Sequence, residues 1–389
     1  MAPDIPIPNP RGASTHVFEL ARALGQLGDE VHVVCRREGS QKSEEKISGV
    51  SFHRVYRGVV GPLSGKGNLA GADTETQGVQ ARAYNLYLQS FNALFVGVFA
   101  SKLARDHRLQ VIIERETAFG AGAVASLISH RPMVLELIGP RYSKLSAAVC
   151  SRVLAYNEKM VPRGTMGKTV FVKAAVNLDL FKPDPIARSS VRKRLGLEGS
   201  TVVGYVGTAQ SWHGIEDLIS ASRKLRESVL GLKYLLVGPM PAKVRALAGS
   251  DPDAAFILAG TVPYPEVADY INACDIMVAP YNILKSSRRA KGIGSPLKVL
   301  EYMACGKAVI GSDLPQVADI IDDRETGLLF TQGNPDLLAD RIEELSRDGA
   351  LRESLGSRAI EKVRREFSWL SFARRVNSEL INCVNTHAS

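Results

Sequence analysis

The sequence predicts an α/β protein made of two doubly wound domains with parallel sheets. Short apolar segments alternate with helix-like segments along most of the chain, as in parallel strands joined by crossover helices. The length of 389 residues suits two domains, because one domain commonly takes about 100 to 200 residues. Residues 177–185 hold two prolines and two aspartates and fit no regular element. We therefore expect the domain boundary there, with a substrate held in a cleft between the two domains.

In the first half, the clearest helix is Ser14–Leu27, whose apolar residues recur at helical spacing. Ser14 is the expected N-cap, and Gly28 ends the helix. Residues 64–78 are polar and rich in glycine, so we expect a mobile loop there. The other expected elements of this half are strands at 31–35, 111–114 and 133–137 and helices at 81–106 and 119–129.

In the second half, strand and helix patterns alternate without a break. Thr201–Val206 is almost entirely apolar, which is typical of a parallel strand covered on both faces. The expected strands lie at 201–206, 233–237, 256–258, 276–279 and 308–311. The expected helices lie at 189–195, 214–227, 242–248, 265–273 and 296–304, and two more helices close the chain.

The charge of the chain bears on its partners. The formal net charge is +9, which leaves three partners open: nucleic acid, an anionic membrane surface or a phosphorylated substrate. The chain has no basic recognition helix and no stacking motif, so we expect no nucleic-acid partner. The hydrophobic and charged fractions, 45% and 23%, are ordinary for a globular protein.

Cysteines and apolar segments bear on location. The five cysteines lie far apart without a Cys-x-x-Cys pair, which fits a reducing compartment and predicts neither a zinc site nor a disulfide framework. No apolar run approaches the roughly 20 residues that span a bilayer, and the first residues lack the form of a signal peptide. We expect a cytoplasmic protein whose basic surface suits peripheral binding at the inner membrane face.

Two glycine-containing loops are candidate ligand sites. Gly12 precedes the first helix, where backbone N–H groups can approach an anion; an ordinary turn is the alternative. The second loop, Gly207–Gly214, links a strand to a helix and carries Trp212 and His213. Loops at the carboxyl ends of strands commonly bind ligands, although Trp212 could equally be a core residue.

The segment Gly294–Gly306 carries the most chemistry. Ser295 is the expected N-cap and Pro296 the first helical residue. The N–H groups of Leu297 and Lys298 would then face an anion, and the Lys298 ammonium adds charge. Glu301 lies one turn further along the same face, where a carboxylate can accept hydrogen bonds from ribose hydroxyls. The alternative is a capped surface helix with a Lys298–Glu301 ion pair.

These residues resemble the donor-binding region of the family 4 glycosyltransferases of the GT-B fold, in a Ser-Pro-Leu-Lys variant of the donor motif. The resemblance extends over nearly the whole chain. It includes the stretches 12–34, 203–207, 212–218, 308–313, 325–330 and 367–369, the last of which precedes a helix that in this family returns to the first domain.

The resemblance implies a retaining transfer of sugar from a UDP- or GDP-sugar to a glycan or lipid-linked acceptor, without metal or cofactor. It implies an acceptor domain at 1–176, a donor domain at 187–366 and a returning helix at 367–389. By position, Glu301 would hold the ribose and Leu297 and Lys298 the phosphates. Val262 would lie at the base.

The chain departs from the family pattern at several positions. Ile293 stands where the family has the first glutamate of Glu-x7-Glu, and Thr208 and His213 stand where it has arginine and lysine on the diphosphate. A frequent histidine of the family aligns near Ile138. We expect Lys298, with Arg289 and Lys291 of the preceding basic loop, to supply the missing charge.

Two carboxylates are the candidate catalytic residues of the first domain. Glu114 and Glu136 end successive expected strands, and either could orient an acceptor hydroxyl. For Glu114 the alternative is an ion pair with Arg115 or a nearby lysine.

By this resemblance, the first domain is expected to lack its opening strand. Residues 1–8 hold three prolines and lead directly into the first glycine loop, where the family has a hydrophobic strand. We expect either that the true start of the protein lies upstream or that this domain is marginally stable. The alternatives to a transferase are a nucleotide-sugar epimerase or hydrolase and a non-catalytic nucleotide-sugar-binding partner of an active transferase.

Overall fold

A computed structural model of the chain describes residues 1–8, 12–55, 79–115, 119–138, 142–226, 228–249, 256–284 and 296–388. The chain forms two compact units. One contains Met1–Val172 together with Ala373–Ser389, and the other contains Lys173–Phe372. We refer to them as unit 1 and unit 2.

Unit 2 is a doubly wound domain with one sheet of six parallel strands in the order β11-β10-β9-β12-β13-β14. The strand order reverses between β9 and β12, because β9 continues to β10 on one side and the chain returns to β12 on the other. The strands are β9 (Thr201–Val206), β10 (Leu232–Val237), β11 (Phe256–Gly260), β12 (Ile276–Ala279), β13 (Ala308–Ser312) and β14 (Leu328–Phe330).

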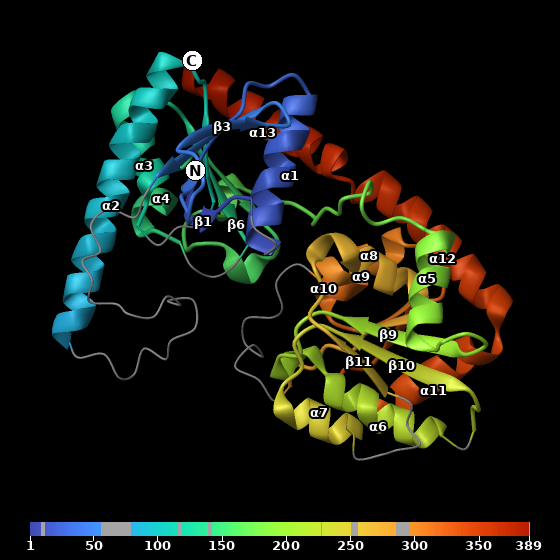
Figure 1. The fold of residues 1–389 in the computed structure, drawn as a ribbon. Helices are drawn as coiled ribbons and strands as arrows, with labels where there is room; N and C mark the ends of the chain where they lie inside the picture. The colour runs from blue at the N-terminus through green and yellow to red at the C-terminus, as the bar shows by residue number, and fades with distance from the viewer. Residues whose placement is uncertain are drawn as a thin grey trace. The chain divides into compact units, whose positions relative to one another are not determined.

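Helices cover both faces of this sheet, which explains the nearly continuous apolar sequence of β9 and β12. One face packs against α6 (Ile215–Leu225), α7 (Ala242–Gly249) and α11 (Pro335–Arg347). The other carries α8 (Val267–Ala273) and α9 (Leu297–Ala304), and α12 (Gly349–Glu366) packs against α9 and β13 (Figure 1). The parallel sheet and its crossover helices confirm the predicted α/β class for this unit.

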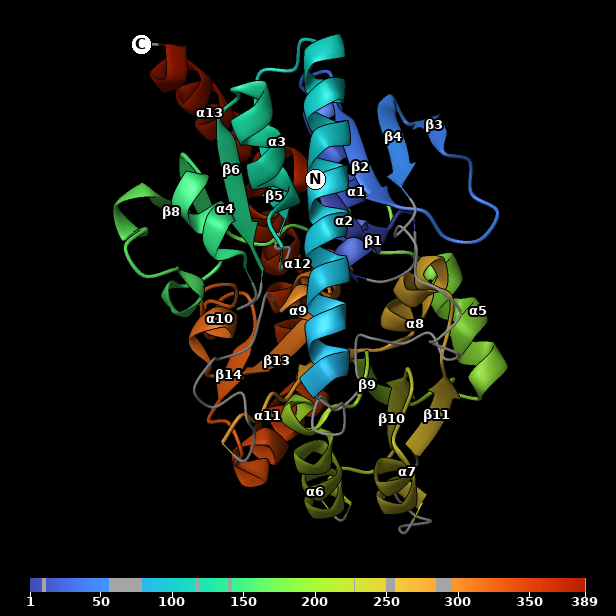
Figure 2. The same cartoon turned by 90° about the vertical axis from the view of Figure 1, so that its left-hand side faces the viewer.

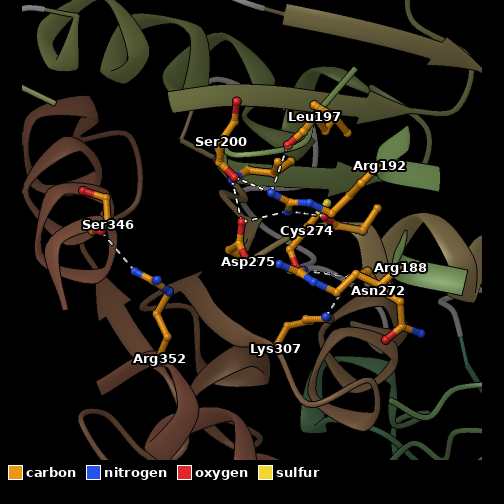
Figure 3. Close-up of polar contacts among 12 residues, drawn as sticks. Arg188, Arg192, Leu197, Ser200, Asn272, Cys274, Asp275, Lys307, Ser346 and Arg352 are labelled. Atoms are coloured by element: carbon orange, nitrogen blue, oxygen red, sulfur yellow. Dashed lines mark hydrogen bonds and ion pairs between the residues drawn. The ribbon is translucent and has the colours of Figure 1, made fainter. Parts of the chain in front are cut away.

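Unit 2 begins with α5 (Pro185–Leu195), and the predicted start at residue 189 is wrong. Asp184 caps the helix through bonds from the N–H groups of Ile186 and Ala187, and Pro185 is tolerated in the first turn because its missing N–H needs no partner there. Asp275, next to β12, then accepts hydrogen bonds from Arg188 and Arg192 (Figure 3) and from the Val202 N–H. This network fixes α5 to the sheet.

Unit 1 contains two four-stranded sheets in the orders β1-β2-β4-β3 and β5-β6-β7-β8. All pairs are parallel except β3 with β4. The strands are β1 (Ala2–Pro6), β2 (His32–Arg36), β3 (Glu44–Ile47), β4 (Val50–Val55), β5 (Ile112–Arg115), β6 (Met133–Leu137), β7 (Arg152–Ala155) and β8 (Thr169–Phe171).

The expectation that unit 1 lacks an opening strand is wrong. Ala2–Pro6 forms β1, which runs parallel to β2 with Ala2 opposite Cys35. Prolines are admissible because β1 is short and its register is irregular. The Arg115 N–H donates to the Met1 carbonyl at 3.0 Å, so the first residue also contacts β5.

Helices lie on both sides of the unit 1 sheets. α3 (Ala121–Ser129) and α4 (Lys144–Val149) pack on one face, and α2 (Val79–Asp106) packs against α3 (Figure 2). On the other side lie α1 (Gly12–Gln26) and the unit 1 part of α13 (Trp369–Ala388). Because α1 begins at Gly12, Ser14 lies inside the helix and the predicted Ser14 cap is wrong.

Two further observations complete the fold. The loop predicted at 64–78 lies outside the described residues. Among the helices that the structure describes, none combines the length and apolar character needed to cross a bilayer.

Candidate functional site

The candidate site of unit 2 lies where the strand order reverses. In open α/β sheets, ligands bind at such a point, beyond the carboxyl ends of the strands. The Lys298 side chain, from the first turn of α9, reaches this point and donates a hydrogen bond to the Tyr205 hydroxyl at 2.7 Å. Tyr205 belongs to β9, and Tyr281 follows β12. A cation therefore lies at the ends of the two strands that flank the reversal.

Aromatic rings surround this cation. Lys298 Nζ lies 4.5 Å from the ring centroid of Tyr205 and 5.1 Å from that of Tyr281. Ring faces attract a cation, but burial removes water from it and lowers the pKa of Lys298 to about 7. Its nitrogen bonds to a hydroxyl and is not paired with Glu301, so the ion pair considered from the sequence is not formed. The ammonium retains capacity for an anionic ligand.

A tyrosine fixes α9 to the end of β9. The Tyr302 hydroxyl donates to the Val206 carbonyl at 2.8 Å and accepts from the Val206 N–H at 2.9 Å. Tyr302 is fully buried, so this pair of hydrogen bonds sets where the first turn of α9 begins. The helix starts at Leu297, with Pro296 as the N-cap residue. The prediction of Pro296 as the first helical residue is thus wrong by one position.

Close backbone packing shapes the loops around Lys298. Gly207 follows β9 with φ +141°, and a Cβ there would lie 3.1 Å from Lys298 Nζ. Gly238 follows β10 with φ +122°, and its Cβ would lie 2.2 Å from the Gly207 carbonyl oxygen. Gly214 has φ +66° and its Cβ would lie 1.6 Å from the Pro280 oxygen. A side chain at Gly214 or Gly238 would therefore require the backbone to move, whereas one at Gly207 would press on the end of the Lys298 side chain.

Glu301 and Tyr264 form a second polar group, one helical turn from Lys298. The Tyr264 hydroxyl donates to Glu301 Oε1 at 3.3 Å. Burial raises the pKa of Glu301 to about 7, against the lowering effects of Tyr264 and Lys298. Val262 lies in the same segment as Tyr264, is partly buried, and follows β11. The carboxylate and hydroxyl together can bond a sugar diol.

His213 joins the aromatic group, and the Trp212 ring packs edge-on against His213 with ring centroids 5.6 Å apart. The His213 ring centroid lies 6.4 Å from that of Tyr205 and 5.7 Å from that of Tyr281. Its Nδ1 contacts the Thr208 carbonyl, which also accepts from the Tyr205 hydroxyl. The Trp212 carbonyl accepts from the Asn282 N–H at 3.0 Å, which ties the loop after β9 to the loop after β12.

Several predicted residues cannot be placed at this site. Arg289, Lys291 and Ser295 lie outside the described residues. Gly12 is the first residue of α1 in unit 1. Of the predicted donor set in unit 2, the structure thus brings together His213, Lys298 and, one turn on, Glu301.

Unit 1 has its own polar cluster at the carboxyl ends of β5, β6 and β7. The buried His16 Nε2 lies 2.7 Å from Glu136 Oε1. Burial alone would raise the pKa of Glu136, but His16 and Arg115 reverse this and hold it below its ordinary value. The cluster is therefore built around an ionised carboxylate that accepts from the imidazole.

Unused hydrogen-bonding capacity surrounds the His16–Glu136 pair. Arg115 stands beside Glu136 in the register of β5 with β6, and Tyr156 and Asn157 follow β7 directly. Within the part of the chain that the structure describes, Arg115 Nη1, Tyr156 Oη and both amide atoms of Asn157 are buried without a hydrogen-bond partner. Buried polar atoms are nearly always bonded, so these atoms fit a polar ligand at this end of the unit.

Glu114 lies on the opposite face of β5, because adjacent residues of a strand point to opposite sides. Its carboxylate accepts from Ser146 Oγ at 2.9 and 3.1 Å and from the Ala123 N–H at 3.0 Å. It therefore anchors α3 and α4, and it is not paired with Arg115. A Cβ at Gly122 would lie 2.5 Å from Glu114 Oε2, so the helix approaches the carboxylate closely.

His16, Tyr205 and Tyr281 were not predicted from the sequence. Tyr205 stands two residues before the predicted ligand glycine Gly207, and Tyr281 stands two residues after β12. Both positions lie at carboxyl ends of strands, which is a usable signal. His16 carries no such signal, because its partner Glu136 is 120 residues away.

Two family models match the two parts of the chain. Residues 10–137 match the model described as Glycosyltransferase Family 4, and residues 200–348 match the model described as Glycosyl transferases group 1. The first match lies in unit 1 and the second in unit 2.

Three curated relatives match this chain at low sequence identity but over more than half of its length. The D-inositol 3-phosphate glycosyltransferase of Kribbella flavida is 26% identical over 92% of this chain and 87% of its own length. An uncharacterized glycosyltransferase of Methanocaldococcus jannaschii, MJ1178, is 25% identical over 69% of this chain and 75% of its own. A GDP-mannose-dependent alpha-(1-6)-phosphatidylinositol monomannoside mannosyltransferase of Mycobacterium tuberculosis is 25% identical over 55% of this chain and 56% of its own.

Solved structures match over almost the whole chain. Anabaena Alr3699/HepE, crystallised with UDP and glucose, has a TM-score of 0.69 at 18% identity and covers 96% of this chain and 97% of its own. The sucrose-phosphate synthase of Thermosynechococcus elongatus has a TM-score of 0.70 at 19% identity, covering 97% of this chain and 94% of its own. At such identities the likeness concerns the fold.

Proposed function

This chain is a glycosyltransferase of the GT-B fold, and on that premise we propose that it moves a sugar from a UDP- or GDP-sugar to a glycan or lipid-linked acceptor with retention of configuration. Unit 2 would bind the donor, and unit 1 would bind the acceptor. The choice between UDP and GDP rests on relatives alone: HepE was crystallised with UDP, and the mycobacterial relative is named for GDP-mannose.

The position of Lys298 carries this proposal. A buried ammonium at the strand-order reversal, beside a glycine turn and the start of a helix, suits a diphosphate. When the sugar leaves, negative charge grows on the diphosphate oxygen, and a preorganised cation stabilises that charge. Lys298 would thereby replace the arginine and lysine that the family places where Thr208 and His213 stand here.

Glu301 and Tyr264 would hold the ribose. A carboxylate accepts hydrogen bonds from two neighbouring hydroxyls, and the Tyr264 hydroxyl at 3.3 Å can keep it in place. Because α9 carries both Lys298 and Glu301 on one face, the same helix would bind the ribose and the diphosphate. Val262 would then lie at the nucleobase.

The acceptor would bind at the His16–Glu136 pair. The unpartnered polar atoms of Arg115, Tyr156 and Asn157 can bond sugar hydroxyls, and the ionised Glu136 can orient the attacking hydroxyl. Because Lys298 neutralises the leaving group in this scheme, the transfer itself would need no metal ion.

An exposed apolar stripe favours a lipid-linked acceptor at a membrane surface. Phe91, Leu94, Phe95 and Val98 of α2 are between 47% and 60% exposed, and they recur at the spacing of one helix face. A contiguous apolar stripe on a basic protein suits the surface of an anionic bilayer. This would make the enzyme peripheral at the membrane, facing the cytoplasm.

Binding and turnover together test the proposal. We expect isothermal titration to show binding of UDP or GDP, but not of ADP, at one site per chain, and we expect the matching nucleotide sugar to be slowly hydrolysed without an acceptor. With lipid-linked acceptors, NMR of the product should show the anomer of the donor. An inverted anomer would contradict retention.

Each alternative predicts a different result. A non-catalytic partner would bind the nucleotide sugar without hydrolysis or transfer to any acceptor tried, and an epimerase would convert the sugar while it remained attached to the nucleotide. For the membrane, sedimentation with anionic vesicles should fall for the Phe91→Ser/Phe95→Ser variant. The exposed Leu230→Ser change in unit 2 serves as its control.

A further inference from the structure

Three of the seven histidines of the chain, His32, His53 and His107, gather in unit 1 around the start of β2. Glu30 and His32 stand at the start of β2, and His107 follows α2. Glu30 Oε1 lies 2.9 Å from His32 Nε2 and 3.6 Å from His107 Nδ1. One ligand atom from each residue lies within 4.8 Å of the other two.

A second layer orients the His32 ring. His32 Nδ1 lies 2.9 Å from Nε2 of His53, and His53 Nδ1 lies 3.4 Å from Glu44 Oε1. His53 is buried, and its ring stacks on that of His32 with centroids 5.2 Å apart. Glu44, His53, His32 and Glu30 therefore form a continuous row of polar contacts.

This row has more contacts than protons. Three contacts join two carboxylates and two imidazoles, whereas two neutral imidazoles carry two N–H groups. If His53 donates to Glu44 and His32 donates to His53, the Nε2 of His32 directs a lone pair at a carboxylate oxygen 2.9 Å away. Two acceptors in contact repel each other, and either a second proton on the ring or a shared metal cation removes that repulsion, which the metal titration below distinguishes.

The same row is the usual support of a metal-binding histidine. A histidine that ligates a metal commonly donates its other N–H to a further acceptor, which fixes the tautomer and the ring orientation. Here His53, itself held by Glu44, is that acceptor for His32.

We propose that Glu30, His32 and His107 bind a divalent transition-metal ion of the zinc type. Tetrahedral zinc, with ligands at about 2.0–2.1 Å, separates its ligand atoms by about 3.3 Å. The separations of 2.9 and 3.6 Å lie on either side of that value, and the two histidine nitrogens lie within 4.8 Å of each other, so the side chains would rotate to bind the ion. Two imidazoles and one carboxylate suit zinc, and three protein ligands leave one position open.

A cavity beside Glu30, His32 and His107 could supply the fourth ligand of the ion. Glu30, His32 and His107 line a cavity of about 480 Å³ in unit 1, bounded by α1, β2, the segment before β5 and α13, and Arg115 and Glu136 line the same cavity. A water molecule or a small anion in that cavity could complete the coordination. The ion would also connect the start of β2 to the end of α2, so it would stabilise unit 1 away from the proposed donor site.

Metal titration of the full-length protein without a histidine tag tests this proposal. We expect one Zn²⁺ per chain, and with Co²⁺ we expect the visible absorption bands of a four-coordinate site. His107→Gln and Glu30→Gln should each weaken binding at least about tenfold and abolish the Co²⁺ bands. The Glu30 and His107 side chains are 66% and 43% exposed, so these variants should fold.

A matched control and a supporting-layer variant complete the experiment. His387→Gln removes an exposed histidine of α13 outside the cluster and should bind Zn²⁺ as the parent protein does. Glu44→Gln leaves the three ligands in place and should weaken binding by about 10- to 100-fold. Absence of stoichiometric binding, or equal binding by His107→Gln and the parent, would overturn the proposal.

Discussion

At the residue scale, the proposed donor site depends on Lys298, whose charged form is disfavoured by burial. Burial lowers the pKa of Lys298 to about 7, which means that the folded protein disfavours the charged form. Between pH 7 and its ordinary pKa, the unfolded chain binds a proton there that the folded chain does not, so stability should rise with pH across that range. An anionic ligand reverses the unfavourable contribution by pairing with the charge.

Lys298→Met should therefore separate stability from binding. The thioether has a similar length and can pack between Tyr205 and Tyr281 without a buried charge. We expect UDP or GDP binding and transfer to fall by about 100-fold or more, while the melting temperature of the free protein at pH 7 stays equal or rises. Calorimetry with and without nucleotide measures both.

The control for this variant is Lys243→Met. Lys243 is an exposed residue of α7 that pairs with Glu216 on the surface, so the same change of charge should leave nucleotide binding intact. Unimpaired binding by Lys298→Met, or a lower melting temperature with intact binding, would contradict the assigned role.

The pH dependence of donor binding follows from two perturbed groups. Above pH 7 the free Lys298 loses its proton, which the diphosphate needs, so affinity should fall by up to about tenfold per pH unit. Below pH 7 the Glu301 carboxyl, whose pKa burial raises to about 7, becomes protonated and accepts the ribose hydroxyls less well. Affinity should thus be greatest near pH 7.

Two variants test which group titrates on the acidic limb and which on the alkaline limb of this pH profile. Lys298→Arg keeps its charge at every pH used and should flatten the alkaline limb alone. Glu301→Gln should weaken binding and flatten the acidic limb alone. An alkaline limb that persists in Lys298→Arg would mean that another group titrates there.

At the residue scale, only some residues of the candidate sites could be predicted from the sequence. Lys298 and Glu301 were predictable, because a helix start after a Gly-x-Gly-Ser-Pro segment indicates anion binding and their spacing puts them on one face. Tyr205 and Tyr281 lie at carboxyl ends of strands, which was a usable signal, but the local sequence does not distinguish a tyrosine that packs in the core from one that contacts a cation. The His16–Glu136 pair joins distant segments, which local patterns cannot reveal.

At the element scale, strong periodic segments were predicted and weak edge segments were not. The strands at 133–137, 201–206 and 276–279 have the predicted bounds, because buried parallel strands are short apolar runs. β3 (Glu44–Ile47) is mainly charged and exposed at a sheet edge, so no apolar pattern marks it. β4 (Val50–Val55) buries Val50 and Phe52, an alternation that the sequence analysis overlooked.

The glycines at the two ends of β10 give a matched test of loop packing. Gly231, before β10, and Gly238, after it, both have positive φ, but a Cβ at Gly231 meets nothing within 4 Å. Gly231→Ala should cost about 1 kcal/mol of unfolding free energy from φ alone. Gly238→Ala adds a clash with the Gly207 carbonyl at 2.2 Å and should cost more than about 3 kcal/mol.

The same pair should differ in nucleotide binding. Gly207 donates its N–H to the Val237 carbonyl at 2.9 Å, so relief of the Gly238 clash would displace the turn beneath Lys298. We expect weaker UDP or GDP binding for Gly238→Ala and unchanged binding for Gly231→Ala. Urea unfolding measures the stability of each variant, and titration measures its nucleotide binding. Equal losses in both variants would show that the turn does not position the cation.

At the scale of the whole molecule, part of the basic excess has a structural role. Arg192 donates to Asp275 and to three backbone carbonyls (Figure 3), and the buried Lys362 pairs with Asp322 at 2.7 Å. These charges hold unit 2 together and are unavailable to a ligand. The Lys362–Asp322 pair is neutral, whereas Asp275 pairs with both Arg188 and Arg192, so these contacts account for a single charge of the net +9.

The two-unit organisation predicts that donor binding and transfer can be lost separately. Glu136→Gln removes the ionised carboxylate of unit 1 but keeps a hydrogen-bond acceptor for His16, so the unit should remain folded. We expect the rate of transfer to fall by about 100-fold or more, with the dissociation constant for UDP or GDP unchanged. Glu301→Gln, in unit 2, should instead raise that constant. If Glu136→Gln weakened nucleotide binding as strongly as transfer, the assignment of acceptor chemistry to unit 1 would fail.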